Sequence, residues 1–155
     1  MDLDDFADAI TYKLDFLIMD CCLMGGVESL YAIRDKVGIV AASPTEVLSD
    51  GFCYESLNSR IFCRGEADVV GAASDFFAQY YPSSSCTAAV YDMSGMDGIA
   101  SVCRALADKY HACLDTLKES RVQNYSRNTP DWYYDMEDIF FDTAKELNFS
   151  LTKML

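Results

Sequence analysis

Apolar residues recur at helical spacing along most of the chain. In the first such stretch, Leu3–Cys21, they fall on one face for about five turns. The aspartates near its start suit the positive end of a helix dipole. Gly25-Gly26 would end this helix, and the spacing that follows predicts a second helix over 27–40.

Further helices are predicted from start signals and spacing. In "SPTE", Ser43 is a good N-cap, Pro44 suits the first helical position and Glu46 closes a capping box, which predicts a short helix before Asp50 and Gly51. The other segments with helical spacing are 52–63, 66–81, 97–117 and 130–147. Segment 97–117 is apolar on more than one face, as expected of a helix surrounded by others. Because no period-two alternation stands out, the patterns predict an all-α bundle of roughly six to eight helices around a buried central helix.

The length and net charge of the chain limit the classes of function that the protein can have. The 155 residues, 51% of them hydrophobic, fit one domain over 1–155 with a sizeable core. The formal net charge is −13 and the isoelectric point is near 4.2. Such an acidic protein would be repelled by phosphate backbones and anionic lipid, so we expect no nucleic-acid partner and no membrane insertion.

Cysteine usage and the termini favour an intracellular protein. The seven cysteines form no CxxC pair, and we expect reduced thiols that mostly lie in the core. The start "MDLDDF" is acidic where a secretory signal would be basic. The run "FLIMDCCLM", interrupted by Asp20, and the end "LNFSLTKML" are both too short to span a bilayer. We therefore expect no transmembrane tail.

The sequence contains few candidate catalytic or metal-binding motifs. The one histidine, His111, has Cys103 and Cys113 nearby in sequence, but four ligands at zinc spacing are missing. No Ser/His/Asp set, GxGxxG or GxxxxGK[ST] motif is present. Carboxylates such as Asp135 and Glu137 fit a solvated helix face. The sequence therefore predicts no metal, no cofactor and no enzyme activity.

One short stretch resembles a recognition motif. In "LYAIRDKV", Leu30 is followed by Ile33 at +3, Asp35 at +5 and Val37 at +7. This resembles the third Bcl-2-homology (BH-3) motif, in which an apolar stripe and an aspartate dock into a hydrophobic groove. The motif usually has a small residue where this chain has Arg34.

Two later stretches resemble the other motifs of that family in the family's order. "SGMDGIASV" resembles a degenerate BH-1 motif with Gly98 as its glycine, and "PDWYYDMEDIFF" resembles a BH-2 segment with Trp132 as its tryptophan. Eroded motifs of this kind are typical of viral Bcl-2-like proteins. The chain thus resembles an iridovirus or poxvirus Bcl-2 homologue over nearly its whole length.

The resemblance implies an inhibitor of apoptosis in the host cell cytoplasm. Such a protein would sequester the BH-3 helix of a host pro-apoptotic protein, such as Bim, in an apolar groove. The implied groove residues are Val47, Leu48, Phe52, Leu57, Val69, Val70, Ala73, Phe77, Gly98, Ile99 and Val102. Because Ile99 stands where the family has an arginine, Arg60 or Arg64 would pair with the aspartate of the ligand.

Two alternatives remain open at this level. The same fold could block inflammatory NF-κB signalling by binding host adaptors or kinases, and a homodimer is compatible with either viral role. The chain could also be a helical interaction module with another partner. Binding of BH-3 peptides would separate the first reading from the other two.

Overall fold

The computed structural model describes residues 2–62, 65–84, 86–114, 122–126 and 133–146. Contacts divide the chain into two compact units, Met1–Asp97 and Gly98–Leu155, and each unit is described by itself. No helix among the described residues is long and apolar enough to cross a membrane.

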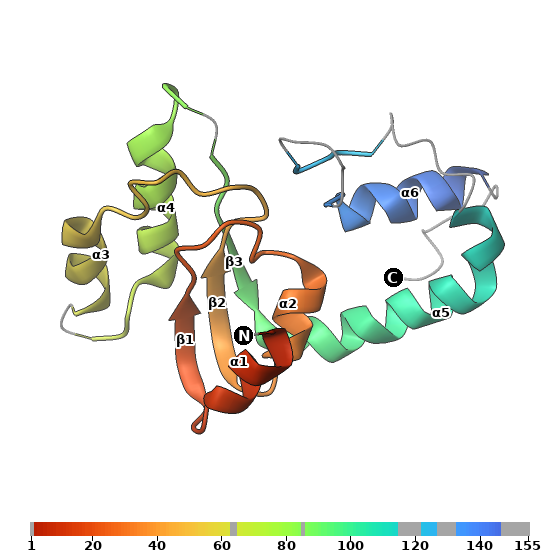
Figure 1. The fold of residues 1–155 in the computed structure, drawn as a ribbon, viewed down its shortest axis with the longest axis horizontal. Helices are drawn as coiled ribbons and strands as arrows, with labels where there is room; N and C mark the ends of the chain where they lie inside the picture. The colour runs from red at the N-terminus through yellow and green to blue at the C-terminus, as the bar shows by residue number, and fades with distance from the viewer. Residues whose placement is uncertain (1, 63–64, 85, 115–121, 127–132, 147–155) are drawn as a thin grey trace. The chain divides into compact units, whose positions relative to one another are not determined.

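The first unit is a mixture of helices and strands (Figure 1). Its elements in chain order are α1 (Leu3–Ala9), β1 (Leu14–Ile18), α2 (Val27–Ala32), β2 (Val37–Ala42), α3 (Tyr54–Ile61), α4 (Val69–Tyr80), β3 (Ala89–Asp92) and a 3₁₀ turn, η1 (Met93–Gly95). Helix α5 (Met96–Leu114) begins directly after this turn, and the second unit also contains α6 (Met136–Glu146). In the second unit, Asn124 and Tyr134 form an isolated antiparallel bridge.

The three strands form one sheet in the order β1-β2-β3. Strand β1 pairs parallel with β2, and β2 pairs antiparallel with β3. Successive residues of a strand point to opposite faces, so Leu17 and Ile18 belong to different packing clusters. Leu17 packs with α1 and α2, whereas Ile18 packs against Phe76 of α4. The sheet therefore lies between two helical layers, as Figure 1 shows.

The prediction of an all-α bundle is wrong, first in the segment Leu3–Cys21. Helix α1 ends at Ala9, because Ile10 takes an extended conformation, and residues 14–18 form β1. A parallel strand covered on both faces has a nearly continuous apolar run and no alternation. The run "DFLIM" therefore matched helical spacing by chance.

The second predicted helix, 27–40, is also half strand. Helix α2 ends at Ala32, and β2 follows from Val37 to Ala42. Val37 and Val40 are fully buried, and β-branched side chains of this kind suit a strand covered on both faces. Residues 43–49 form no helix, although the hydroxyl of Ser43 accepts from the Thr45 N–H at 3.1 Å as predicted for a cap.

The other four predicted helices are present in shortened form as α3, α4, α5 and α6. The prediction that segment 97–117 is a buried central helix is wrong. Of the side chains described between residues 96 and 108, only Met96 is buried. The predicted cap at Thr129–Pro130 and the tryptophan Trp132 lie outside the described residues.

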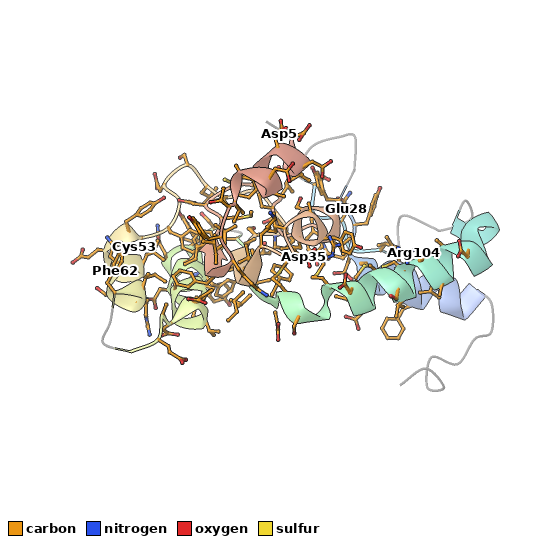
Figure 2. All side chains as sticks on the ribbon, turned by 90° about the horizontal axis from the view of Figure 1, so that it is seen from below. Asp5, Glu28, Asp35, Cys53, Phe62 and Arg104 are labelled. Atoms are coloured by element: carbon orange, nitrogen blue, oxygen red, sulfur yellow. The ribbon has the colours of Figure 1, made fainter. Side chains whose placement is uncertain are left out.

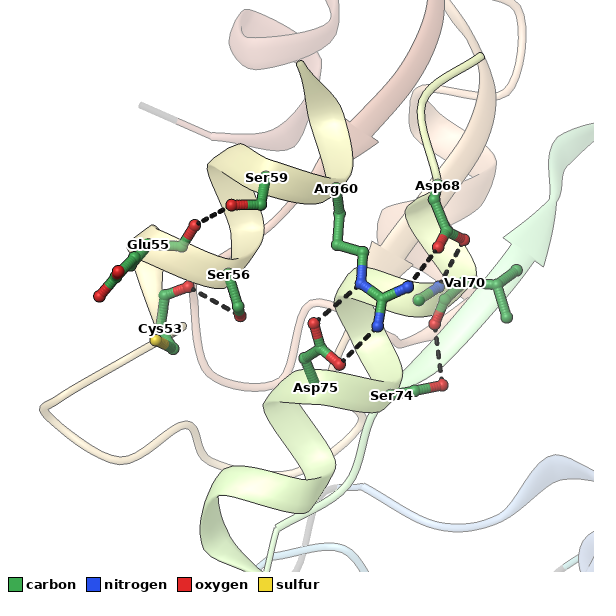
Figure 3. Close-up of polar contacts among 10 residues, drawn as sticks. Cys53, Glu55, Ser56, Ser59, Arg60, Asp68, Val70, Ser74 and Asp75 are labelled. Carbon is green, nitrogen blue, oxygen red and sulfur yellow. Dashed lines mark hydrogen bonds and ion pairs between the residues drawn. The ribbon is translucent and has the colours of Figure 1, made fainter. Parts of the chain in front are cut away.

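A charged cluster joins α3 to α4 (Figure 3). Arg60 of α3 donates to both carboxylate oxygens of Asp75 on α4, each at 3.0 Å, and to Asp68 at 2.8 Å. Asp68 is also the N-cap of α4, where it accepts from the backbone N–H of Gly71. The guanidinium of Arg60 is thus engaged within the protein, and the structure gives it no role toward a ligand aspartate.

The packing predicts that truncation of a core side chain will strongly reduce the stability of the first unit. Ile33 is fully buried (0% exposed) among α1, α2 and the sheet. Ile33→Ala should lower the free energy of unfolding by about 2–5 kcal/mol through lost burial and a residual cavity. Val70→Ala on α4, where the side chain is 63% exposed, should change it by about 0.5 kcal/mol or less. Urea denaturation measures both, and equal effects would contradict the assigned core.

The Arg60–Asp75 pair predicts a pH dependence of stability. The hydrogen bonds from the Arg60 guanidinium hold the pKa of the Asp75 carboxyl below its ordinary value. Because the folded-state pKa is lowered, the stabilisation is present above the unfolded-state pKa, near 4, and is lost as pH falls through the folded value. Asp75→Asn should therefore be less stable than the parent protein at pH 7.

This difference between the parent protein and Asp75→Asn should shrink below about pH 4 in thermal melts. In an Arg60→Met background the substitution should have little effect at either pH, which makes the double variant the control. A difference that is the same at pH 7 and pH 3 would mean that the ion pair does not contribute.

Candidate active site

The loops that follow β1 and β2 meet at the carboxyl ends of these parallel strands. The backbone N–H of Met19, directly after β1 ends, donates to the carbonyl of Ala41 in β2 at 2.9 Å. Further along, Leu23 donates to Thr45 and Gly25 donates to Ser43, both at 2.9 Å. The ladder between the strands thus continues into the loops. In open α/β sheets, ligands bind beyond the carboxyl ends of the strands, so this edge is where a site is expected.

Cys22 lies in the first of these loops and is exposed. Its Sγ accepts the backbone N–H of Val47 at 3.3 Å, and the thiol donates to the Val47 carbonyl at 3.5 Å. The next residue, Leu23, has a positive φ of 61°, which is uncommon for a side chain of this kind and marks a sharp turn. The sulfur of Cys22 is thus exposed at a sharp turn of the first loop and hydrogen-bonded to the backbone of the second loop.

The second loop is held in place by a cluster of hydroxyl groups. The buried Ser43 hydroxyl lies 3.0 Å from that of Thr87, and the Thr45 and Thr87 hydroxyls are 2.9 Å apart. Gly25 allows the two loops to approach closely, since a Cβ there would lie 2.8 Å from the Pro44 backbone nitrogen. The N–H of Val47 is therefore presented to Cys22 from a well-supported loop.

Asp20, two residues before Cys22, connects this edge to the loop before α3. Its Oδ2 accepts from the Tyr54 hydroxyl at 2.7 Å and from the Phe52 backbone N–H at 3.3 Å. Gly51 has a φ of 61°, and a Cβ at this position would collide with the Asp20 carboxylate. The hydrogen bond to Asp20 raises the pKa of Tyr54, so this hydroxyl stays a donor at neutral pH.

The surroundings of Asp20 are acidic. Burial raises the pKa of Tyr80, and the nearby carboxylates of Asp50 and Asp20 raise it further. A cavity of about 1170 Å³ adjoins the site, and Asp20 and Cys21 are among its lining residues. The cavity also exposes the acidic side chains of Asp2, Asp4 and Glu28. Such a site attracts a cationic group. Among the described residues, no three His, Cys, Asp or Glu side chains gather as metal ligands.

Three of the other described cysteines, Cys53, Cys86 and Cys103, lack this combination of features. Cys53 is exposed beside α3 (Figure 2), and hydrogen bonds from the Ser56 N–H and hydroxyl lower its pKa. Burial raises the pKa of Cys86, and the Cys103 thiol contacts the sulfur of Met136. Of Cys22 and these three cysteines, only Cys22 combines exposure, an N–H donor at sulfur and a place beyond a parallel strand.

The prediction that most cysteines are core residues is wrong for Cys21, Cys22 and Cys53, which are exposed. A usable signal was present in the sequence. The apolar run before Asp20, the two cysteines and Gly25-Gly26 have the order strand, turn and helix, which is the setting of many nucleophiles. Because the apolar run before Asp20 also fits helical spacing, the spacing predicts a helix there and hides the order of strand, turn and helix.

The predicted groove residues have different settings within the two units. Val47, Leu48, Phe52 and Leu57 belong to the cluster around Phe76 and Tyr80. Val69 and Ala73 are buried in α4, whereas Val70 and Phe77 of the same helix are exposed. Gly98, Ile99 and Val102 belong to the second unit. Arg64 lies outside the described residues.

Comparison with known proteins identifies the family. The clostripain family (peptidase C11) matches residues 1–148. An inactive zymogen C11 protease from Parabacteroides distasonis is 35% identical with a TM-score of 0.80, and the match covers 91% of this chain and 41% of that one. A B. fragilis cysteine protease is 25% identical with a TM-score of 0.75, covering 94% and 66%.

A clostripain from Bacteroides thetaiotaomicron, in complex with the peptide inhibitor BTN-VLTK-AOMK, shares the fold. It is 21% identical with a TM-score of 0.78, and the match covers 96% of this chain and 70% of that chain. The chain thus spans less than half the length of the Parabacteroides protease. No curated protein matches it.

These matches overturn the functional predictions made from the sequence. The resemblance to a viral Bcl-2 homologue is wrong, and with it the inhibition of apoptosis, the groove for a BH-3 partner such as Bim, and the alternative role in NF-κB signalling. The prediction of a non-enzyme is also wrong, since the family and the structural neighbours are C11 cysteine proteases. The chain belongs to the clostripain family of C11 cysteine proteases.

Proposed function

We propose that this protein is a cysteine peptidase with Cys22 as its nucleophile, and that it cleaves peptide bonds after basic residues. The observation that carries the proposal is the setting of the Cys22 sulfur. It is exposed beyond the carboxyl end of β1, accepts the Val47 N–H at 3.3 Å, and belongs to a residue only two positions after Asp20.

The proposed reaction uses the chemistry of a thiolate. The Cys22 thiolate attacks the carbonyl carbon of the substrate, and the C–N bond breaks to leave a thioester on Cys22. The departing amine takes up a proton, and water then hydrolyses the thioester and restores the thiol.

The first unit contributes the nucleophile but no histidine. The one histidine of the sequence, His111, belongs to α5 in the second unit. Because an imidazole is the usual proton acceptor for a catalytic thiol, we propose that the base belongs to a part of the protein other than the first unit.

Charge around the nucleophile supports a basic residue at the cleavage position. Burial raises the pKa of Tyr80, and the Asp50 and Asp20 carboxylates lie close enough to raise it further, so these two acidic groups share one neighbourhood. A carboxylate is a strong partner for a lysine ammonium or an arginine guanidinium. The inhibitor bound to the B. thetaiotaomicron clostripain has the peptide VLTK, which ends in lysine.

Removal of the nucleophile tests the proposal directly. Cys22→Ala should lower kcat/KM for peptide substrates by about 10⁴-fold or more, because the substitution removes the thiol that forms the thioester. Release of a fluorescent amine from peptides that end in lysine, arginine, leucine or aspartate measures both activity and preference. Cys21→Ala and Cys53→Ala should retain most of the activity and serve as matched controls. Full activity in Cys22→Ala would exclude the assigned nucleophile.

A second variant tests whether the Asp20 carboxylate recognises the basic residue of the substrate. Asp20→Asn keeps the shape of the side chain and removes its charge, so kcat/KM for lysine and arginine substrates should fall by about 100-fold. Activity on leucine substrates should remain low, as in the parent protein. Labelling of Cys22 by iodoacetamide checks that the nucleophile is still accessible. A basic preference that survives this change would assign the recognition to another group.

A further inference from the structure

The two carboxylate oxygens of Asp20 have different environments. Oδ2 accepts two hydrogen bonds, from the Tyr54 hydroxyl at 2.7 Å and from the Phe52 backbone N–H at 3.3 Å. Oδ1 is buried, and no described residue donates a hydrogen bond to it. A buried carboxylate oxygen without a donor is unfavourable, so a bound cation at this oxygen would be stabilising.

This asymmetry distinguishes the two basic side chains. Each carboxylate oxygen has two lone pairs, and both lone pairs of Oδ2 already have donors. The guanidinium of arginine binds a carboxylate best through two parallel bonds, one to each oxygen. The ammonium of lysine is a compact charge with three donors that can rotate, and it can bind one oxygen. Because both lone pairs of Oδ2 are occupied, Asp20 therefore suits a lysine side chain better than an arginine side chain.

We propose that Tyr54 determines the specificity of this site and selects lysine over arginine by occupying Oδ2 of Asp20. The inference rests on the proposed function, because it assumes that Asp20 binds the basic residue of the substrate. Tyr54 contacts Asp20 through its hydroxyl only, and its side chain is otherwise more than half exposed (57%).

The protein holds the Tyr54 hydroxyl in this position from the preceding segment. The hydroxyl of Tyr80 donates to the carbonyl of Gly51 at 2.6 Å, and the ring of Phe52 stacks on that of Phe76 with centroids 4.3 Å apart. Tyr54 is then the first residue of α3. Because these contacts do not involve the Tyr54 side chain, Tyr54→Phe should remove one hydrogen bond and leave the loop in place.

The experiment compares two substrates in two variants. For peptides that differ only in lysine or arginine at the cleavage position, the parent protein should have the higher kcat/KM with lysine. In Tyr54→Phe, a lone pair of Oδ2 becomes available to the guanidinium fork, and the ratio of lysine to arginine kcat/KM should fall by about tenfold, the equivalent of one charge-assisted hydrogen bond. The ratio does not depend on the fraction of active enzyme, so partial unfolding of the variant would not alter it.

The matched control is Tyr12→Phe, which removes the hydroxyl of a tyrosine that is 82% exposed and should leave the ratio unchanged. An equal loss on both substrates in Tyr54→Phe would mean a structural role and overturn the inference, as would a parent protein that prefers arginine. In both cases the basic preference, and so the proposed function, would stand. A parent protein that cleaves after neither lysine nor arginine would overturn the proposed function and the inference together.

Discussion

The parallel pairing of β1 with β2 is the constraint on which the first unit depends. The register joins Leu14 to Val37 at one end and Ile18 to Ala41 at the other. Beyond Ile18, the same ladder continues through Met19 and Leu23, so the hydrogen bonds that build the sheet also fix the loop of Cys22. The nucleophile proposed here is thus positioned by the sheet and not by a flexible segment.

Helical layers on both faces make this pairing possible. Leu17 faces α1 and α2, and Ile18 faces α4, so the short strand β1 is covered on both sides. The Arg60 cluster couples α4 to α3, and α3 carries Tyr54 to the Asp20 carboxylate. The contacts that hold α3 against α4 therefore also support the hydrogen bond from Tyr54 to Asp20 at the carboxyl edge of the sheet.

The motif in "LYAIRDKV" shows why spacing misled the interpretation. Leu30 and Ile33 are buried with Val37 in one cluster, as a helical stripe would require. However, Val37 belongs to β2, and the chain turns between α2 and that strand. The Arg34 guanidinium lies 3.8 Å from the centroid of the Tyr31 ring and binds Asp97 at 2.9 Å, so no small residue is needed for close helix packing.

The sequence by itself determined the local features of this protein. Caps, glycines and apolar spacing were sufficient to locate α3, α4, α5 and α6 approximately, and composition established the acidic charge. Only the tertiary structure decided that residues 14–18 and 37–42 are strands, because a parallel pair forms from segments far apart and is buried on both faces. The candidate site depended on the same nonlocal contacts. The fold gives Cys22 a hydrogen bond from the Val47 N–H and a place beyond the end of β1, and neither feature can be read from the spacing of the cysteines.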